Sequence, residues 1–151
     1  MIKIICIGKI KEKYLMDAIE EYKKRISKYT KLEIIELKDY SMDDIHKVLE
    51  LEKEQIKRYI DPKDYVISME IEGEQISSEI LAKKIDSILN TNSNITFVIG
   101  GSYGLDDSIK QCANYHLSFS KMTFPHQLFR VLLLEQIYRS YKINNNESYH
   151  K

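Results

Sequence analysis

Three stretches in the last third of the chain carry residue types that could do chemistry. The first is the glycine-rich segment Gly100–Leu105, which follows the apolar run Phe97–Ile99. The second is the mixed segment Leu117–His126, and the third is the polar tail Asn144–Lys151. Glycines let a ligand approach the main chain, and His, Tyr and Lys side chains can exchange protons, stack on bases or attract phosphate. These stretches predict a ligand site with a charged surface beside it.

The glycine segment predicts a strand-to-helix turn at the carboxyl end of a sheet, where ligands of open α/β folds bind. Its spacing is G-G-x-x-G rather than G-x-G-x-x-G, and Asp106 and Asp107 follow where a pyrophosphate would need free amides. A pyrophosphate cradle is therefore disfavoured. A turn without any ligand would also use glycine, so the motif alone leaves ligand binding and plain turn geometry open.

The segment Leu117–His126 leads from an expected strand into Pro125, which suits the first turn of a helix because it has no N–H to satisfy. Main-chain groups of Phe119–Phe124 are expected beside the glycine turn, where they could hydrogen-bond an adenine ring. His126 begins the helix, and the positive end of the helix dipole is expected to lower its pKa. Both a functional role and a structural or solvent-facing role are open for His126.

The helix after Pro125 is apolar on more than one face, although a helix packed on one sheet needs a single apolar stripe. The excess favours a second buried surface, most simply a homodimer contact. Glu135 and Arg139 are spaced for an ion pair within the helix. The chain then ends in Tyr149, His150 and Lys151, which would suit an RNA base and its phosphate, although such polar tails are often disordered.

Apolar runs alternate with segments of helical period along the whole chain, which is typical of an α/β fold with a mostly parallel sheet. Strands are expected at Ile2–Ile7, Leu32–Leu37, Tyr65–Met69, Ile95–Ile99 and His116–Ser120. Helices are expected at Glu12–Tyr29, from an N-cap in Ser41–Asp44 to Tyr59, and at Ser77–Leu89, Asp106–Asn114 and Pro125–Tyr141. No internal repeat or linker interrupts this succession, so residues 1–151 are expected to form one domain.

The 151 residues have 23 basic and 23 acidic side chains and a formal net charge of zero. Their distribution is uneven: residues 1–31 have nine Lys or Arg against four Asp or Glu, residues 32–120 nine against seventeen, and residues 121–151 five against two. Basic ends around an acidic middle fit either solvated helix faces or one basic surface formed by both ends. A neutral chain is therefore compatible with a nucleic-acid partner.

Cys6 and Cys112 are expected to be buried, reduced thiols, because neither lies in a CxxC pair or near a His at metal-ligand spacing. No metal site is expected. The initial apolar run is too short for a signal peptide, and no run approaches the roughly 20 apolar residues of a membrane span. The protein is therefore expected to be cytoplasmic, with no membrane partner.

The segments FVIGGSYGL and LSFSKMTFPHQLFRVLLLEQIYR, together with the initial IKIICIGKIK and the terminal YHK, resemble the SPOUT methyltransferases. Within them, the whole chain resembles the RlmH family of ribosomal large-subunit pseudouridine methyltransferases. The resemblance implies an α/β fold in which a mostly parallel sheet is flanked by helices and the C-terminal part forms a deep trefoil knot, an exception to unknotted topology. It also implies a homodimer whose knots form the cofactor pockets.

The same resemblance implies S-adenosylmethionine as the cofactor. Its expected contacts lie at the end of the third strand, in the glycine turn and in the knot loop: Met69, Gly100, Phe119, Ser120, Lys121, Met122, Thr123 and Phe124. The expected substrate-side residues are His126, Arg139, Tyr149, His150 and Lys151, with the tail of one protomer completing the site of the other. The family often ends in YHR, and Lys151 keeps the charge of that arginine without its bidentate geometry.

The activity implied is methylation of N3 of a pseudouridine in 23S ribosomal RNA, on assembled ribosomes. Methyl transfer from a sulfonium depends chiefly on alignment of donor and acceptor and requires no metal. We hypothesise that His126 orients the base or accepts the N3 proton, while Arg139 and the tail hold phosphate. Two alternatives remain, namely an RNA-binding module that lacks methyl transfer and a nucleotide-dependent α/β enzyme of another kind.

Overall fold

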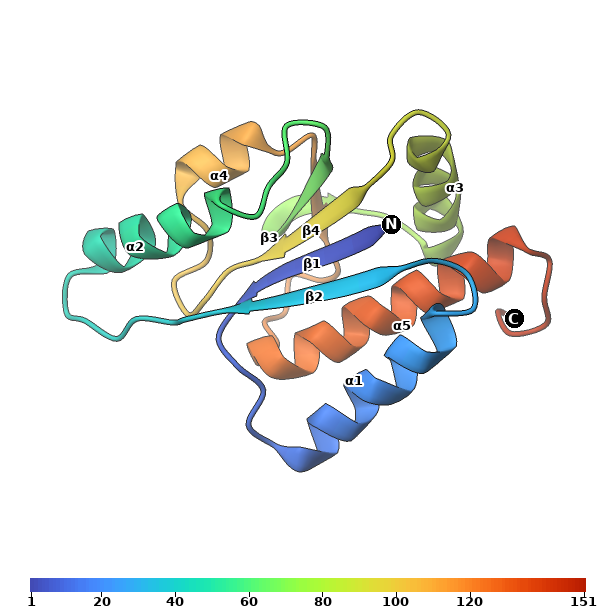
Figure 1. The fold of residues 1–151 in the computed structure, drawn as a ribbon, viewed down its shortest axis with the longest axis horizontal. Helices are drawn as coiled ribbons and strands as arrows, with labels where there is room; N and C mark the ends of the chain where they lie inside the picture. The colour runs from blue at the N-terminus through green and yellow to red at the C-terminus, as the bar shows by residue number, and fades with distance from the viewer.

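The computed structural model describes all of residues 1–151 as one succession of alternating strands and helices (Figure 1). The strands are β1 (Ile2–Ile7), β2 (Leu32–Leu37), β3 (Tyr65–Gln75), β4 (Ile95–Ile99) and β5 (Tyr115–Ser118). The helices are α1 (Lys13–Ile26), α2 (Ile45–Lys57), α3 (Ser78–Leu89), α4 (Asp107–Cys112) and α5 (His126–Asn144). Each expected element is present, and the differences lie at the element ends.

The five strands form a single sheet in the order β2-β1-β4-β3-β5, and every neighbouring pair is parallel. Parallel strands place their carboxyl ends along one edge of the sheet. Because β4, β3 and β5 are adjacent, the segments that follow them also lie side by side. This topology brings Met69, the glycine turn and the loop after β5 to the same edge.

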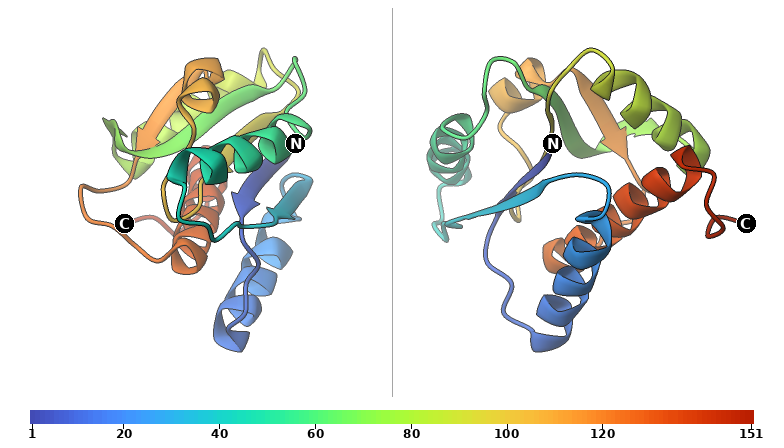
Figure 2. Two further views of the ribbon diagram at one scale, coloured as in Figure 1. Left: turned by 90° about the vertical axis from the view of Figure 1, so that its left-hand side faces the viewer. Right: turned by 45° about the vertical axis from the view of Figure 1, so that its right-hand side comes forward.

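Helices cover both faces of the sheet, with α1 and α5 on one side and α2 and α4 on the other (Figure 2). Successive side chains of β1 point to opposite faces of the sheet and so belong to different cores. Ile4 and Cys6 join the larger core cluster with α1, α3 and α5. Ile5 and Ile7 join the smaller cluster with α2 and α4. All six residues of β1 are buried, as expected for a parallel strand covered on both faces.

The start of α2 and the end of β3 bear on the expected element bounds. The N-cap of α2 is Asp44, whose carboxylate accepts a hydrogen bond from the Lys47 N–H at 3.3 Å. The cap therefore lies at the end of the expected Ser41–Asp44 segment, and no acidic residue follows it in the first turn. β3 continues beyond Met69 through a register shift against β5 and resumes pairing at Glu74. The segment between these two pairings is released from the ladder and enters the candidate site.

The two cysteines differ in their surroundings. Cys6 is fully buried, and burial raises the pKa of its thiol to about 12, so it is an inert thiol as expected. Cys112 is exposed, and the expectation that it is buried was wrong. It lies at the C-terminal end of the short helix α4, where only Ile109 is fully buried.

α5 packs between α1 and α3 beneath the sheet, which uses much of its apolar surface. Leu128 remains exposed, and Val131 and Leu132 are half-buried. After α5 the chain turns back at Asn146, whose φ is 54°, and the C-terminus lies beside the helix (Figure 1). None of the helices is both long and apolar enough to cross a membrane.

Candidate functional site

A cavity of about 600 Å³ opens where β3, β4 and β5 end, and we call it the carboxyl-end cavity. Its walls are the segment after β3, the glycine turn after β4, the loop after β5 and the first turn of α5. This volume falls within the roughly 300–1,000 Å³ that small-molecule and cofactor sites occupy. The cavity therefore has the size and the position in the sheet of a ligand site.

Nearly all of the expected cofactor residues line this cavity. They are Met69, Gly100, Phe119, Ser120, Met122, Thr123 and Phe124. Lys121 lies in the same loop but is exposed and does not line the cavity. His126 also lines it, so the structure brings one expected substrate-side residue to the cofactor residues.

The glycine turn is held by contacts that exclude side chains. A Cβ at Gly100 would lie 2.4 Å from the carbonyl oxygen of Gly104, which is closer than any tolerated contact. Gly104 has a φ of 79°, in the left-handed region that glycine adopts without strain, and its N–H donates to the Gly101 carbonyl at 3.0 Å. Two of the glycines are thus needed to shape the turn itself, and the turn forms a wall of the cavity.

The loop after β5 offers unpaired main-chain groups. The N–H of Met122 donates to Ser120 Oγ at 3.0 Å, and Ser118 Oγ donates to the Ser120 carbonyl at 3.1 Å. None of the other N–H groups in residues 119–124 has a protein acceptor. Main-chain groups in a cavity wall that are not paired within the protein are available to hydrogen-bond a ligand.

Aromatic rings supply the apolar part of the cavity. The ring of Phe129 lies 5.1 Å from that of Phe119 and 6.4 Å from that of Phe124, measured between centroids. Such a group can pack against a flat heteroaromatic ring. Sequence reasoning counted Phe129 only among the apolar residues of the last helix, and its position one turn after Pro125 was the signal that could have placed it here.

His126 combines exposure to the cavity with a lowered pKa. Burial lowers the pKa of its imidazole below the ordinary 6.5, and the nearby Arg130 guanidinium lowers it further. From the sequence we expected the helix dipole to lower this pKa, whereas in the structure the causes are burial and Arg130. A lowered pKa keeps the imidazole neutral at pH 7, in the form that can accept a proton.

Arg130 is the most buried charged side chain of this region and was not anticipated from the sequence. Its guanidinium contacts Glu36 Oε2 at 2.7 Å and donates to the carbonyls of Ile7 and Gly8 at 3.1 and 2.8 Å. These groups belong to the carboxyl ends of β1 and β2. Arg130 therefore fixes the first turns of α5 against the sheet and positions His126.

Three of the other expected substrate-side residues, Arg139, Tyr149 and His150, gather at the opposite end of α5, around Glu135. Glu135 Oε2 accepts hydrogen bonds from the hydroxyls of Tyr22 and Tyr149 at 2.7 and 2.8 Å. Glu135 Oε1 pairs with Arg139 at 2.7 Å, as the i,i+4 spacing predicted. The Arg139 guanidinium stacks on the Tyr149 ring at 4.7 Å and lies 3.1 Å from Nδ1 of His150. We call these residues the tail cluster.

The tail cluster is held against the body of the protein rather than frayed. His150 Nε2 lies 2.7 Å from Glu79 Oε1, and this hydrogen bond lowers the pKa of Glu79. Burial and the Glu135 carboxylate raise the pKa of Tyr149. Lys151 is exposed and pairs with no side chain. With a rise of about 1.5 Å per residue, Arg139 lies roughly 20 Å from His126 along α5, so one chain does not bring the cluster to its own cavity.

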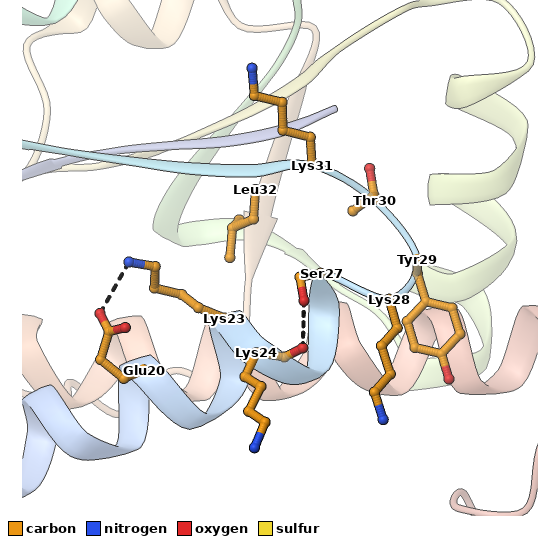
Figure 3. A pocket seen from close by; sticks show the side chains of 9 residues that line it. All are labelled: Glu20, Lys23, Lys24, Ser27, Lys28, Tyr29, Thr30, Lys31 and Leu32. Carbon is orange, nitrogen blue, oxygen red and sulfur yellow. Dashed lines mark hydrogen bonds and ion pairs between the residues drawn. The ribbon is translucent and has the colours of Figure 1, made fainter.

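A basic hollow lies at the C-terminal end of α1 (Figure 3). Four lysines line it against one glutamate: Lys23, Lys24, Lys28, Lys31 and Glu20. Glu20 pairs with Lys23 at 3.0 Å, whereas the other three lysines pair with no acid. The Tyr29 hydroxyl donates to Glu147 at 2.8 Å, which joins the hollow to the tail. The two basic ends of the chain thus lie side by side.

No group of three or more His, Cys, Asp or Glu side chains is arranged to hold a metal ion. The ionisable side chains that line the carboxyl-end cavity are Glu70, Glu72, Tyr103, Lys110 and His126. Glu70 was not anticipated as a site residue, and its position directly after an expected strand end was the available signal.

Comparisons with known proteins agree with this geometry. A family model described as "Predicted SPOUT methyltransferase" matches residues 1–150. A protein from Methanococcus maripaludis is 55% identical over 99% of each chain. Proteins from Clostridium acetobutylicum and Clostridioides difficile are each 51% identical over 99% of each chain, and both are named ribosomal RNA large subunit methyltransferase H.

A solved structure of a probable methylase family protein from Haemophilus influenzae is similar in fold, with a TM-score of 0.58 and 18% sequence identity. The similarity covers 99% of this chain and 70% of that one. At this identity it supports the arrangement of sheet and helices and nothing about the substrate.

Proposed function

The chain belongs to the SPOUT methyltransferase family, and from this membership we propose that it uses S-adenosylmethionine to methylate N3 of a pseudouridine in large-subunit ribosomal RNA. The observation that carries the proposal is the carboxyl-end cavity, which combines unpaired main-chain donors, aromatic rings and a neutral imidazole. The substrate class is supported by two relatives that are each 51% identical in sequence and are named ribosomal RNA large subunit methyltransferase H.

The residues of the carboxyl-end cavity fit the cofactor. Unpaired main-chain groups of residues 119–124 would bind the edge of an adenine, and Phe119 and Phe129 would contact its face. The glycine turn leaves room because no side chain projects from Gly100 or Gly104. When bound, the cofactor supplies a methyl group on a sulfonium that is already an activated leaving group. The protein's task is then to align the acceptor nitrogen.

A proton must leave N3 when that nitrogen is methylated. His126 is the imidazole that lines the cavity, and its lowered pKa keeps it ready to accept a proton at neutral pH. Arg130 holds the start of α5 in place and adds positive charge near this site. We assign His126 as the proton acceptor or base-orienting group and Arg130 as a positioning residue.

The tail cluster and the basic hollow are the proposed RNA-contacting surface. Arg139 and the exposed Lys151 supply positive charge, and Tyr149 supplies a ring for stacking. Since Arg139 lies roughly 20 Å from His126 on the same helix, a homodimer would let the tail of one protomer reach the cavity of the other. The partly exposed Leu128, Val131 and Leu132 are the apolar surface such a dimer could bury. The trefoil knot, like the dimer, stays a prediction from the family.

The test starts with ribosomes that lack the modification, because assembled ribosomes are the proposed substrate. These are incubated with the protein and labelled S-adenosylmethionine, and the ribosomal RNA is then mapped by mass spectrometry. We expect one methyl group on a pseudouridine of the large-subunit RNA. No methyl group should appear at that position in ribosomes that have uridine there instead of pseudouridine. Cofactor binding without any methylated RNA would contradict the substrate assignment, whereas absence of binding to S-adenosylhomocysteine would contradict the cofactor assignment.

A further inference from the structure

Glu70 is a nearly buried carboxylate in the wall of the carboxyl-end cavity. It follows Met69 at the point where β3 leaves its pairing with β5. Only 10% of its side chain is exposed. A carboxylate with so little access to water needs hydrogen-bond donors or a nearby cation to offset its lost hydration.

One carboxylate oxygen of Glu70 is fully engaged within the protein. Oε2 accepts a hydrogen bond from Ser68 Oγ and makes a short contact with Nδ1 of His116. Ser68 Oγ and His116 Nδ1 are themselves 2.8 Å apart. Because Ser68 is completely buried, this arrangement fixes the direction of the Glu70 side chain before any ligand binds.

The other oxygen, Oε1, keeps its capacity to accept hydrogen bonds. The Lys110 ammonium lies 3.9 Å from Oε1, which is beyond hydrogen-bond distance. Lys110 also lines the cavity. The cavity wall therefore presents a fixed carboxylate oxygen as a hydrogen-bond acceptor, and the nearby Lys110 ammonium partly balances its negative charge.

We propose that Glu70 binds the ribose hydroxyls of the cofactor through Oε1, an inference that rests on the proposed use of S-adenosylmethionine. A neutral pair of hydroxyls suits this acceptor better than a second cation, because Lys110 would repel a sulfonium or ammonium placed beside it. An acidic residue at the carboxyl end of a parallel strand is also how dinucleotide-binding folds hold ribose. Ser68 and His116 act as positioning residues for Glu70.

The chain offers a matched control in Glu72, which lines the same cavity, is exposed and makes no hydrogen bond or ion pair. Glu70→Gln and Glu72→Gln remove the same charge from the same cavity. Only the first removes a carboxylate whose direction is fixed. A difference between the two variants therefore reports hydrogen bonding rather than the overall charge of the cavity.

The experiment is calorimetric titration of the wild type and both variants with S-adenosylmethionine, with S-adenosylhomocysteine, and with the 2′-deoxy and 3′-deoxy forms of S-adenosylhomocysteine. We expect Glu70→Gln to weaken binding of the hydroxylated ligand about tenfold to a hundredfold, as for loss of charge-assisted hydrogen bonds, and Glu72→Gln to leave it nearly unchanged. The wild type should lose similar affinity for at least one deoxy ligand, and Glu70→Gln should show little further loss for that ligand.

Three results would overturn the inference. The first is unchanged affinity of Glu70→Gln for S-adenosylhomocysteine. The second is equal affinity of the wild type for S-adenosylhomocysteine and both of its deoxy forms, a result that needs no variant and is independent of any folding defect. The third is a loss in Glu70→Gln that appears with S-adenosylmethionine and not with S-adenosylhomocysteine, which would assign Glu70 to the sulfonium. If the wild type binds none of these ligands, the proposed function itself fails, which distinguishes that outcome from the other three.

Discussion

The two ends of α5 present two different kinds of surface. At the N-terminal end, His126 and Phe129 line a cavity whose other walls are main chain, glycine and aromatic rings. At the C-terminal end, Glu135 and Arg139 join the tail through hydrogen bonds and ion pairs. The first end is shaped to hold a small ligand, and the second presents charge and an aromatic ring to a large one.

This difference suggests how a neutral chain can serve an RNA substrate. The cavity is preorganised by backbone geometry, which tolerates little change in sequence. The tail cluster depends on long side chains that could exchange their internal partners for phosphate and bases. Changes at the cavity should therefore alter cofactor binding or the chemical step, whereas changes at the tail should alter RNA recognition and leave cofactor binding intact.

The largest effect is expected for the chemical step in His126→Ala. Its single-turnover rate on saturating RNA should fall about 10²- to 10⁴-fold, the usual contribution of general acid–base catalysis, with unchanged affinity for S-adenosylhomocysteine. Since burial and Arg130 lower the pKa of His126 below 6.5, the wild-type rate should be flat around pH 7 and fall only as the pH drops through that lowered value. A full rate in the variant would remove His126 from this role.

The next effect concerns the glycine turn. A methyl group at Gly100 would collide with the Gly104 carbonyl, so Gly100→Ala should weaken S-adenosylhomocysteine binding by about a hundredfold or more and lower the melting temperature. Gly104→Ala is the control, because its Cβ meets no atom within 4 Å and only the positive φ opposes it. Similar affinity in both variants would show that the close contact does not shape the cavity.

At the C-terminal end of α5, Arg139→Ala should separate RNA recognition from cofactor binding. We expect cofactor affinity within about twofold of the wild type, and an apparent KM for ribosomes raised about tenfold to a hundredfold as charge-assisted contacts to RNA are lost. Arg139→Lys should recover only part of this loss, because lysine lacks the planar fork. A change in cofactor affinity as large as the change in KM would end the distinction between the two surfaces.

A smaller effect is expected in the basic hollow. Lys24→Glu combined with Lys28→Glu should weaken ribosome binding about tenfold at low salt, and the difference from the wild type should shrink as salt rises. The control is Lys83→Glu combined with Lys84→Glu, which makes the same charge change on α3. Equal effects of the two pairs would show a response to net charge rather than to the hollow.

The smallest effect is expected for Tyr149→Phe. It removes one hydrogen bond to Glu135 while keeping the ring, so the free energy of unfolding should fall by about 0.5–1.5 kcal/mol. Denaturant titration would measure this change. Stability equal to that of the wild type would indicate that the tail is not held by this contact in solution, and the tail cluster would then form only with RNA.

The sequence by itself determined the order and type of every element and the family, and nearly all of the cofactor residues that it predicted line the carboxyl-end cavity. Apolar periodicity and turn residues act locally, so they are readable without the fold. Its error was also local: Cys112 was predicted to be buried, but the short helix α4 buries only Ile109.

Tertiary structure alone decided which residues meet across the fold. Glu70 joins Ser68 and His116 because β3 and β5 are neighbours, and Arg130 reaches β1 and β2 because α5 packs beneath the sheet. The distance between His126 and the tail cluster follows from the length of one helix. The contacts of that cluster with Tyr22 and Glu79, however, depend on how α1 and α3 pack beside α5. Contacts between distant segments depend on strand order and helix packing, and no local pattern encodes them.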